Sequence, residues 1–208
     1  MNRIFTLLLI ILTNNISYSQ IRASIDETGK EVILNSDGTW EYAKVAQTNF
    51  EGNGNWEIKY FVDDFGDPTD SGYITNTDLI QGTFSNSATT NSSLNAFFLV
   101  SGKGNIAVRL FEYGSNAVNA YSTEYYEVKV KDSYGTVHSL PATLYEGGER
   151  LYIDSSARKN KISKMHNLFV KGGELQFVIT SPSSYPSTYK FSVNADGYEN
   201  AFDVLFKD

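Results

Sequence analysis

The sequence predicts a mainly β fold: an antiparallel β-sandwich or barrel-like domain with one amphipathic helix and a short C-terminal helix, preceded by a small β-hairpin. Short runs of β-branched and aromatic residues recur along the 208-residue chain, and such residues favour half-buried strands. Segments rich in Gly, Asn and Ser separate these runs, as turns do in antiparallel sheets. Helical periodicity is confined to two segments, which argues against a parallel sheet of alternating strands and helices.

Residues 1–19 have the pattern of a secretory signal peptide. Arg3 is the only charged residue before the nine-residue run 4–12, which is apolar except for Thr6, and small residues follow at Ser17 and Ser19. The run is far shorter than the roughly 20 residues that a membrane-spanning helix needs. We therefore expect cleavage between Ser19 and Gln20, a periplasmic or extracellular location, and no transmembrane segment in the mature chain.

The net charge and the absence of cysteine narrow the classes of ligand, partner and site that the protein can have. The formal net charge of −7 becomes −8 when residues 1–19 are removed, because Arg3 is their only charged residue. A negative protein repels nucleic acid and anionic membranes. The chain has no cysteine, which excludes disulfides, a lipid anchor on cysteine, a thiol nucleophile and zinc–thiolate sites. Stability must come from packing.

Residues 20–45 are expected to form the small hairpin, followed by a polar linker at residues 46–55. Two short β-type runs, 29–34 and 39–42, flank an Asp-Gly pair, which is a strong hairpin signal. The segment resembles one at the start of many exported Bacteroidota proteins, in which a Gly and a short apolar strand precede Asp-Gly-Thr-Trp. This resemblance implies no chemistry. Two strands alone are marginally stable, so Trp40 is expected to anchor the hairpin on a third strand, the main domain or a partner.

Residues 56–208 are expected to form the main domain, which begins with a strand at 56–62. Regular short strands between turn residues favour an antiparallel sandwich or barrel. The further strand candidates are residues 78–84, 93–100, 105–113, 124–131, 136–145, 149–153, 174–180 and 189–193.

Two segments of the main domain have helical periodicity. In residues 156–171, apolar residues recur at helical spacing, and Gly172 and Gly173 supply the stop. A shorter apolar stripe follows Gly197. The order of strands, a Ser- and Lys-rich helix, two more strands and a terminal helix is similar to that of exported VasI-type accessory proteins of type VI secretion. No functional residue follows from this similarity, and this chain lacks the cysteines that such proteins commonly carry.

The densest acidic segment is residues 63–70. Its carboxylates, set in a tight turn by Gly and Pro, are the oxygen ligands that calcium requires, and they predict a calcium site at Asp63, Asp64, Asp67 and Asp70. Calcium is the only cofactor that the sequence suggests. The spacing does not follow the EF-hand rule, and this favours the alternative of a solvated acidic turn.

A basic cluster spans residues 150–171, which contain a single acidic residue, Asp154. Helical spacing places Arg158, Lys161 and Lys164 on neighbouring positions opposite the apolar stripe. Such a face suits an anionic glycan, lipopolysaccharide phosphate or an acidic partner, but it is equally typical of an ordinary solvated helix. Residues 156–168 contain no Phe, Tyr or Trp, so nucleic acid is not expected there.

Aromatic and histidine residues supply the last candidates. Tyr185 and Tyr189, in a segment held extended by two prolines, are a candidate aromatic platform for a sugar or peptide. The alternative is that they are exposed tyrosines without a ligand, which are common in β-domains. His138 and His166 have no metal-ligand spacing and are interpreted as partly buried structural histidines. The chain contains no G-x-S-x-G motif.

The leading hypothesis is an exported, non-enzymatic binding or assembly module of the cell envelope or secretome, with an envelope protein or a glycan as partner. Its speculative ligand-binding residues are Trp40, Tyr185, Tyr189, Arg158, Lys161 and Lys164. One alternative is a glycan or cell-wall hydrolase that uses paired carboxylates, such as Glu146 with Glu149 or Asp63 with Asp67. The other is a calcium-stabilised structural module.

Overall fold

The computed structural model describes residues 21–24, 31–34, 38–42, 54–155 and 162–206. The chain divides into two units at the boundary between Gln47 and Thr48, and each unit is described by itself. The predicted signal peptide and most of the predicted linker lie outside the described residues. No helix among the residues described here has the length and apolar composition needed to cross a bilayer.

The first unit is a three-stranded antiparallel sheet of β1 (Ile21–Ser24), β2 (Glu31–Leu34) and β3 (Trp40–Tyr42). The predicted hairpin corresponds to β2 and β3, whose register pairs Leu34 with Trp40. Gly38 has a φ of +84°, which glycine adopts without steric cost. β1 pairs with β2 and was not predicted, because four residues with one large apolar side chain give little periodicity. The side chain of Trp40 lies outside the described part.

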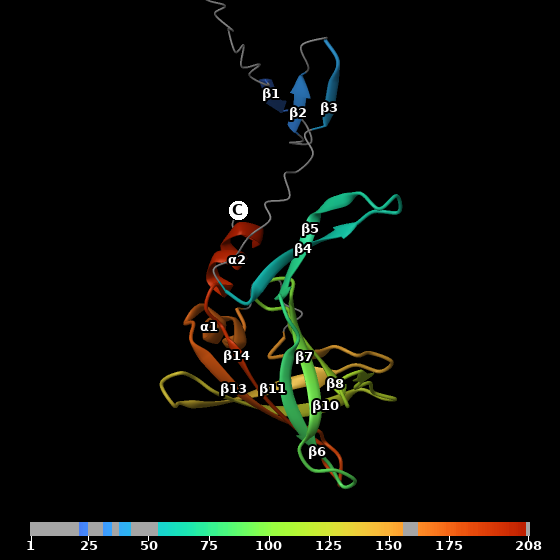
Figure 1. Cartoon of the computed structure of the whole chain (residues 1–208), viewed down its shortest axis with the longest axis vertical. Helices are drawn as coiled ribbons and strands as arrows, with labels where there is room; N and C mark the ends of the chain where they lie inside the picture. Colours follow the sequence, from blue (N-terminus) through green and yellow to red (C-terminus); the bar gives the residue numbers. More distant parts are fainter. Residues whose placement is uncertain (1–20, 25–30, 35–37, 43–53, 156–161, 207–208) are drawn as a thin grey trace, which may run out of the picture. The chain divides into compact units, whose positions relative to one another are not determined.

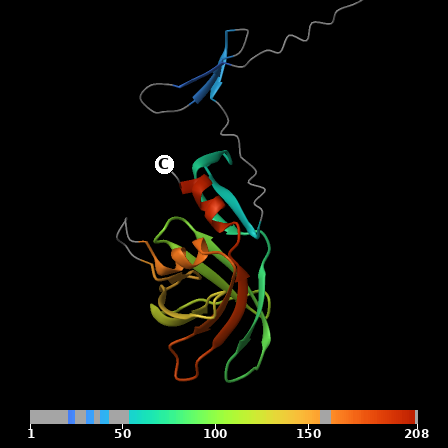
Figure 2. The same cartoon turned by 90° about the vertical axis from the view of Figure 1, so that its left-hand side faces the viewer.

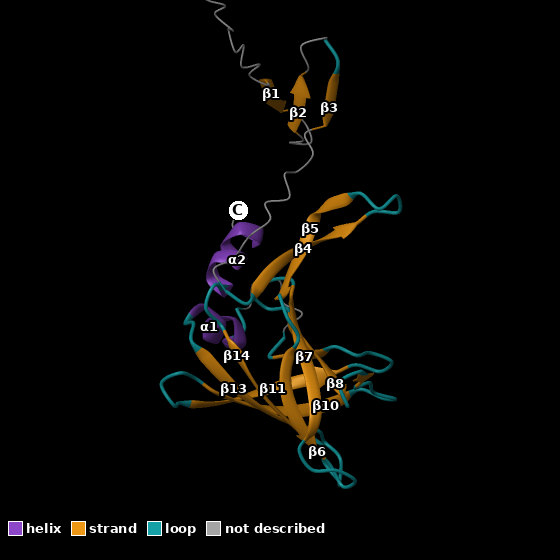
Figure 3. Cartoon of the chain, in the orientation of Figure 1, coloured by secondary structure: helices purple, strands orange, loops and turns teal. Residues whose placement is uncertain are grey.

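The second unit is built on an eight-stranded antiparallel barrel (Figure 1, Figure 3). The hydrogen-bonded order around it is β6-β7-β8-β12-β11-β10-β13-β14, and pairing of β14 with β6 closes the ring. The bounds are β6 (Ile80–Ser85), β7 (Ser92–Val100), β8 (Ile106–Glu112), β10 (Glu124–Lys131), β11 (Val137–Leu144), β12 (Leu151–Ile153), β13 (Glu174–Thr180) and β14 (Thr188–Asn194). A two-residue strand, β9 (Asn116–Ala117), pairs with the last two residues of β8.

Alternation of apolar residues sets which face of each strand lines the barrel interior. In β7, Leu94, Ala96, Phe98 and Val100 are buried, and successive side chains of a strand point to opposite faces. The register pairs Phe98 with Val108, so Ile106, Val108 and Leu110 of β8, which are buried and share one parity, line the same interior. This part of the prediction, a barrel-like antiparallel domain, is confirmed.

A hairpin of β4 (Trp56–Val62) and β5 (Pro68–Asn76) extends from the barrel, because β5 pairs with β7 through Ile74 and Val100 (Figure 1). β5 was not predicted as a strand. Its first half is exposed and polar, so it shows no alternation, and proline is tolerated at the first residue of a strand. The predicted acidic turn is therefore shorter than residues 63–70, and Asp70 belongs to β5.

The two helices are α1 (Lys164–Val170) and α2 (Tyr198–Phe206). Figure 2 shows both at one end of the barrel. α2 begins where the apolar stripe predicted it. α1 is shorter than the predicted 156–171, because the hydroxyl of Ser163 accepts a hydrogen bond from the backbone N–H of His166 at 3.0 Å and caps the helix there. Residues 156–161 lie outside the described residues.

Trp56 connects β4, the barrel and both helices. Its side chain is 1% exposed, and its ring centroid lies 4.9 Å from Phe169 of α1, 5.2 Å from Tyr198 of α2 and 6.2 Å from Phe98 of β7. The indole Nε1 donates a hydrogen bond to the carbonyl of Asn194, at 3.1 Å. We call Trp56, Phe98, Phe169 and Tyr198 the aromatic plug. It fills the helix end of the barrel.

Replacing Trp56 with alanine is expected to lower the free energy of unfolding by about 3–5 kcal/mol, because the cavity cannot collapse between a closed barrel and two helices. Urea denaturation measures the change. Phe65→Ala is the matched control: its side chain is 92% exposed, and we expect a change within about 0.5 kcal/mol. A similar loss in both variants would contradict the proposed role of the plug.

A chain that begins at residue 51 is expected to unfold in one cooperative transition, because the aromatic contacts described for Trp56 are made with residues of the second unit. Differential scanning calorimetry of this fragment beside the mature chain tests the expectation. A broad, non-cooperative transition would show that residues 20–50 contribute to the core.

Candidate functional site

A hollow of about 370 Å³ lies on the outer face of the barrel, over β8, β12 and the turn that joins β11 to β12. Its volume falls within the roughly 300–1,000 Å³ that is typical of small-molecule sites. The side chains that line it are Arg109, Tyr145, Glu149, Arg150 and Tyr152, with Gly147 and Gly148 between them. We call this hollow the arginine–tyrosine groove.

Strand alternation directs these side chains outward. Val108 and Leu110 are buried in the barrel, so Arg109 between them faces outward. By the same rule, Tyr152 faces outward between buried Leu151 and Ile153. The register pairs Leu151 with Val108 on one side and with Leu144 on the other. Arg150 directly precedes β12 and lines the same hollow as Arg109 and Tyr145.

Arg109 is held rigidly. Its guanidinium carbon lies 5.6 Å from the ring centroid of Phe97 and 5.1 Å from that of Phe111, within the range of cation–π attraction. The guanidinium also forms an ion pair with the carboxylate of Glu149. The buried Nε of Arg109 has no hydrogen-bond partner in the described part of the chain. Little side-chain freedom is left for a ligand to remove.

Arg150, in contrast, is exposed and uncompensated. Within residues 54–155 and 162–206, no carboxylate lies within ion-pair distance of it. Two arginines line one hollow, and Glu149 neutralises only one of them. The groove therefore carries one excess positive charge, on a chain whose formal net charge is −7.

The turn between β11 and β12 forms the rim of the groove. The backbone N–H of Gly147 donates to the carbonyl of Ala120, and that of Gly148 donates to the carbonyl of Tyr145, both at 2.9 Å. Gly147 has a φ of +68°, and a Cβ there would meet no heavy atom within 4 Å. The rings of Tyr145 and Tyr152 lie 5.7 Å apart at 64°. Backbone hydrogen bonds thus fix the rim. The space beside Gly147 is open.

Glu146 and Glu149, the predicted hydrolase pair, both belong to this turn. The carboxylate of Glu149 is engaged by Arg109, and the backbone N–H of Glu146 donates to the Thr123 hydroxyl at 3.4 Å. The pairing of Arg109 with Glu149 joins residues 40 positions apart, and no sequence signal indicated it.

The predicted platform of Tyr185 and Tyr189 is not formed. Tyr185 is 77% exposed in the turn after β13, but Tyr189 is 2% exposed and pairs in register with Phe84 and Ile179 in the barrel. Its hydroxyl donates to Oε1 of Glu112 at 3.0 Å, and burial raises its pKa. The signal that was overlooked is spacing, since Tyr189 has the same parity as the apolar residues at 191 and 193.

The structure does not bring the four predicted calcium ligands together. Oδ1 of Asp63 accepts the backbone N–H groups of Phe65 and Asp67, both at 2.9 Å, so this carboxylate organises the turn. Asp64 is exposed beside it, and Asp70 lies in β5. No group of three or more His, Asp or Glu side chains able to hold a metal ion occurs in the part of the chain that the structure describes.

Of the predicted basic face, Arg158 and Lys161 lie outside the described residues. Lys164 is the first residue of α1, where its backbone N–H donates to Oδ2 of Asp154 at 2.7 Å. The Lys164 side chain is exposed.

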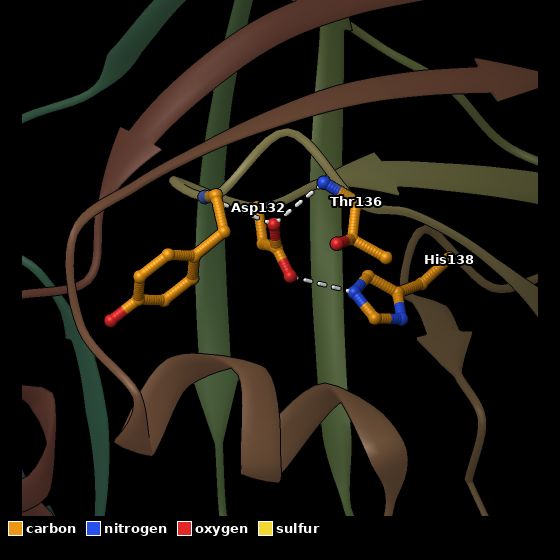
Figure 4. A network of polar contacts seen from close by, with 4 residues as sticks. Asp132, Thr136 and His138 are labelled. Atoms are coloured by element: carbon orange, nitrogen blue, oxygen red, sulfur yellow. Dashed lines mark hydrogen bonds and ion pairs between the residues drawn. The ribbon is translucent and has the colours of Figure 1, made fainter.

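Both histidines are hydrogen-bonded within the fold. Figure 4 shows Asp132 in the turn between β10 and β11: Oδ2 lies 2.9 Å from Nε2 of His138, and Oδ1 accepts the backbone N–H of Thr136 at 2.9 Å. The hydrogen bond from His138 and those from the backbone hold the pKa of Asp132 below its ordinary value of 3.8. His166 is buried, with Nδ1 2.8 Å from the Tyr198 hydroxyl. Burial, and then the charge of Lys103, lowers the pKa of His166 below 6.5.

The free energy of unfolding is expected to fall as the pH drops below 6.5. Unfolded His166 takes up a proton near that pH, whereas folded His166 takes it up only at a lower pH, so acid favours the unfolded state. One such group contributes a slope of up to about 1.4 kcal/mol per pH unit. Urea titrations between pH 7.5 and 5 should show a steeper slope for the wild type than for His166→Gln. Equal slopes would contradict a neutral His166.

Comparison with known proteins gives no family for this chain. No family model matches it, and neither a curated protein nor a solved structure matches it. The resemblances to exported Bacteroidota proteins and to VasI-type proteins therefore stay predictions.

Proposed function

We propose that this protein is an exported, non-enzymatic binding module of the cell envelope or secretome, and that the arginine–tyrosine groove holds its ligand. The observation that carries the proposal is the convergence of Arg109, Arg150, Tyr145 and Tyr152 around one hollow of about 370 Å³. The export pattern of residues 1–19 supports a location outside the cytoplasm.

The side chains of the groove suit binding better than catalysis. Arginine and tyrosine provide fixed hydrogen-bond donors and large contact surfaces. Glu149, the carboxylate of the groove, is already paired with Arg109. A hydrolase of the common type needs two carboxyl groups that flank the scissile bond, and Glu149 is the one carboxylate among the residues that line the groove.

The groove is also organised before any ligand arrives. Two aromatic rings and an ion pair fix Arg109, and backbone hydrogen bonds fix the glycines of the rim. Immobilising a free side chain costs roughly 0.5–1.5 kcal/mol in binding. Because these side chains are already ordered, the groove is expected to bind a ligand more tightly than a flexible groove with the same contacts.

Binding of the mature chain to peptidoglycan, lipopolysaccharide and an oligosaccharide panel tests the proposal. Tyr145→Ala is expected to weaken binding at least tenfold, because it removes one wall of the groove. Tyr185→Ala is the matched control, an exposed tyrosine outside the groove, and should bind as the wild type does. Retention of none of these probes would overturn the proposal, as would loss of binding in Tyr185→Ala alone. Release of cleaved sugar would overturn its non-enzymatic part.

A further inference from the structure

We infer that the ligand of the arginine–tyrosine groove is a sugar residue that carries an anionic substituent, a carboxylate or a sulfate. The inference deepens the proposed function and rests on it. In this arrangement Arg150 pairs with the anionic group, and Tyr145 and Tyr152 contact the sugar ring. Glu149 accepts a hydrogen bond from a sugar hydroxyl.

The charge of the groove selects an anion. Arg150 lines the same hollow as Arg109, and Glu149 forms its ion pair with Arg109. Binding an anionic group lowers the electrostatic energy of an exposed arginine that has a second guanidinium nearby. The planar guanidinium also matches the geometry of carboxylate and sulfate oxygens. The overall charge of −7 opposes polyanions in general, so the attraction is local to this groove.

The tyrosines select a ring with an apolar face. The two rings meet nearly edge to face, and both line the hollow. An aromatic face carries partial negative charge, so it attracts the weakly positive C–H groups on one face of a pyranose. A free inorganic anion has no C–H face and would make no such contact with Tyr145 or Tyr152.

The remaining polar atoms suit hydroxyl groups. The ion pair of Glu149 uses its Oε2, and no hydrogen bond to Oε1 is found among the described residues. Because a carboxylate accepts and does not donate hydrogen bonds, this oxygen suits an O–H donor. A sugar supplies hydroxyl donors on the same ring as its anionic group.

The architecture argues against an extended peptide as the ligand. β8 is paired with β7 and β12, and β12 is paired with β11. Strand addition requires an unpaired strand edge, and the groove lies on the face of a closed part of the barrel. A ligand there has to be recognised by side chains.

Isothermal titration calorimetry of the mature chain with matched oligosaccharides tests the inference. The probes are a neutral galacto-oligosaccharide, the corresponding oligogalacturonate and a sulfated galacto-oligosaccharide. At least one charged probe is expected to bind ten times or more tightly than the neutral one. This preference should shrink when ionic strength rises from 0.05 to 0.5 M, because salt screens exposed charges. Whichever charged probe binds identifies the anionic group.

Charge variants separate the inference from the proposed function. Arg150→Gln should abolish the preference for the charged probe, and Arg150→Lys should retain part of it. Lys190→Gln, which removes an exposed cation on β14, should leave the preference unchanged. Equal binding of the neutral and charged probes, with Tyr145→Ala still disruptive, would overturn the inference and leave the proposed function standing. If none of the three calorimetry probes binds, and the chain also retains no peptidoglycan, lipopolysaccharide or oligosaccharide, the inference and the proposed function both fail.

Discussion

The second unit depends on the aromatic plug around Trp56. An eight-stranded barrel has an interior just wide enough to be filled by side chains, and each open end has to be covered. Trp56 reaches from β4 into the helix end and packs against Phe98, Phe169 and Tyr198. This contact is the reason that a hairpin outside the barrel and two short helices belong to the same core. α1 has seven residues, too few to be stable without such packing.

The groove depends in turn on the register of the closed sheet. Arg109, Arg150 and Tyr145 come together because β12 inserts between β8 and β11, although β8 and β12 are far apart in sequence. A shift of one residue would turn Arg109 into the barrel and Val108 out of it. Burial of the apolar neighbours thus fixes the positions of the polar residues of the groove, so specificity at the surface follows from packing inside.

Local patterns in the sequence were sufficient to predict most strands and α2, because alternation, helical spacing and turn residues are local signals. They failed for β5, whose exposed polar half has no alternation, and for α1, whose start is set by the Ser163 cap. They also failed for the groove. Arg109 lies in a predicted strand without any motif, and its partners at 97, 111 and 149 are brought to it by non-local pairing. Tyr189 is a different case: its parity with Phe191 and Val193 is a local signal of burial, whereas its partner Glu112 is 77 residues away.

Closure of the barrel by β14 and β6 has a consequence for the order of folding. This pairing joins residues near 84 to residues near 189, so the ring cannot close until nearly the whole chain is available. Until then β6 and β14 present unpaired edges, which are templates for association with other chains. Contacts of such long sequence separation also form slowly. The last step of folding in this topology is therefore the one that removes both exposed edges, and it depends on strands at opposite ends of the second unit.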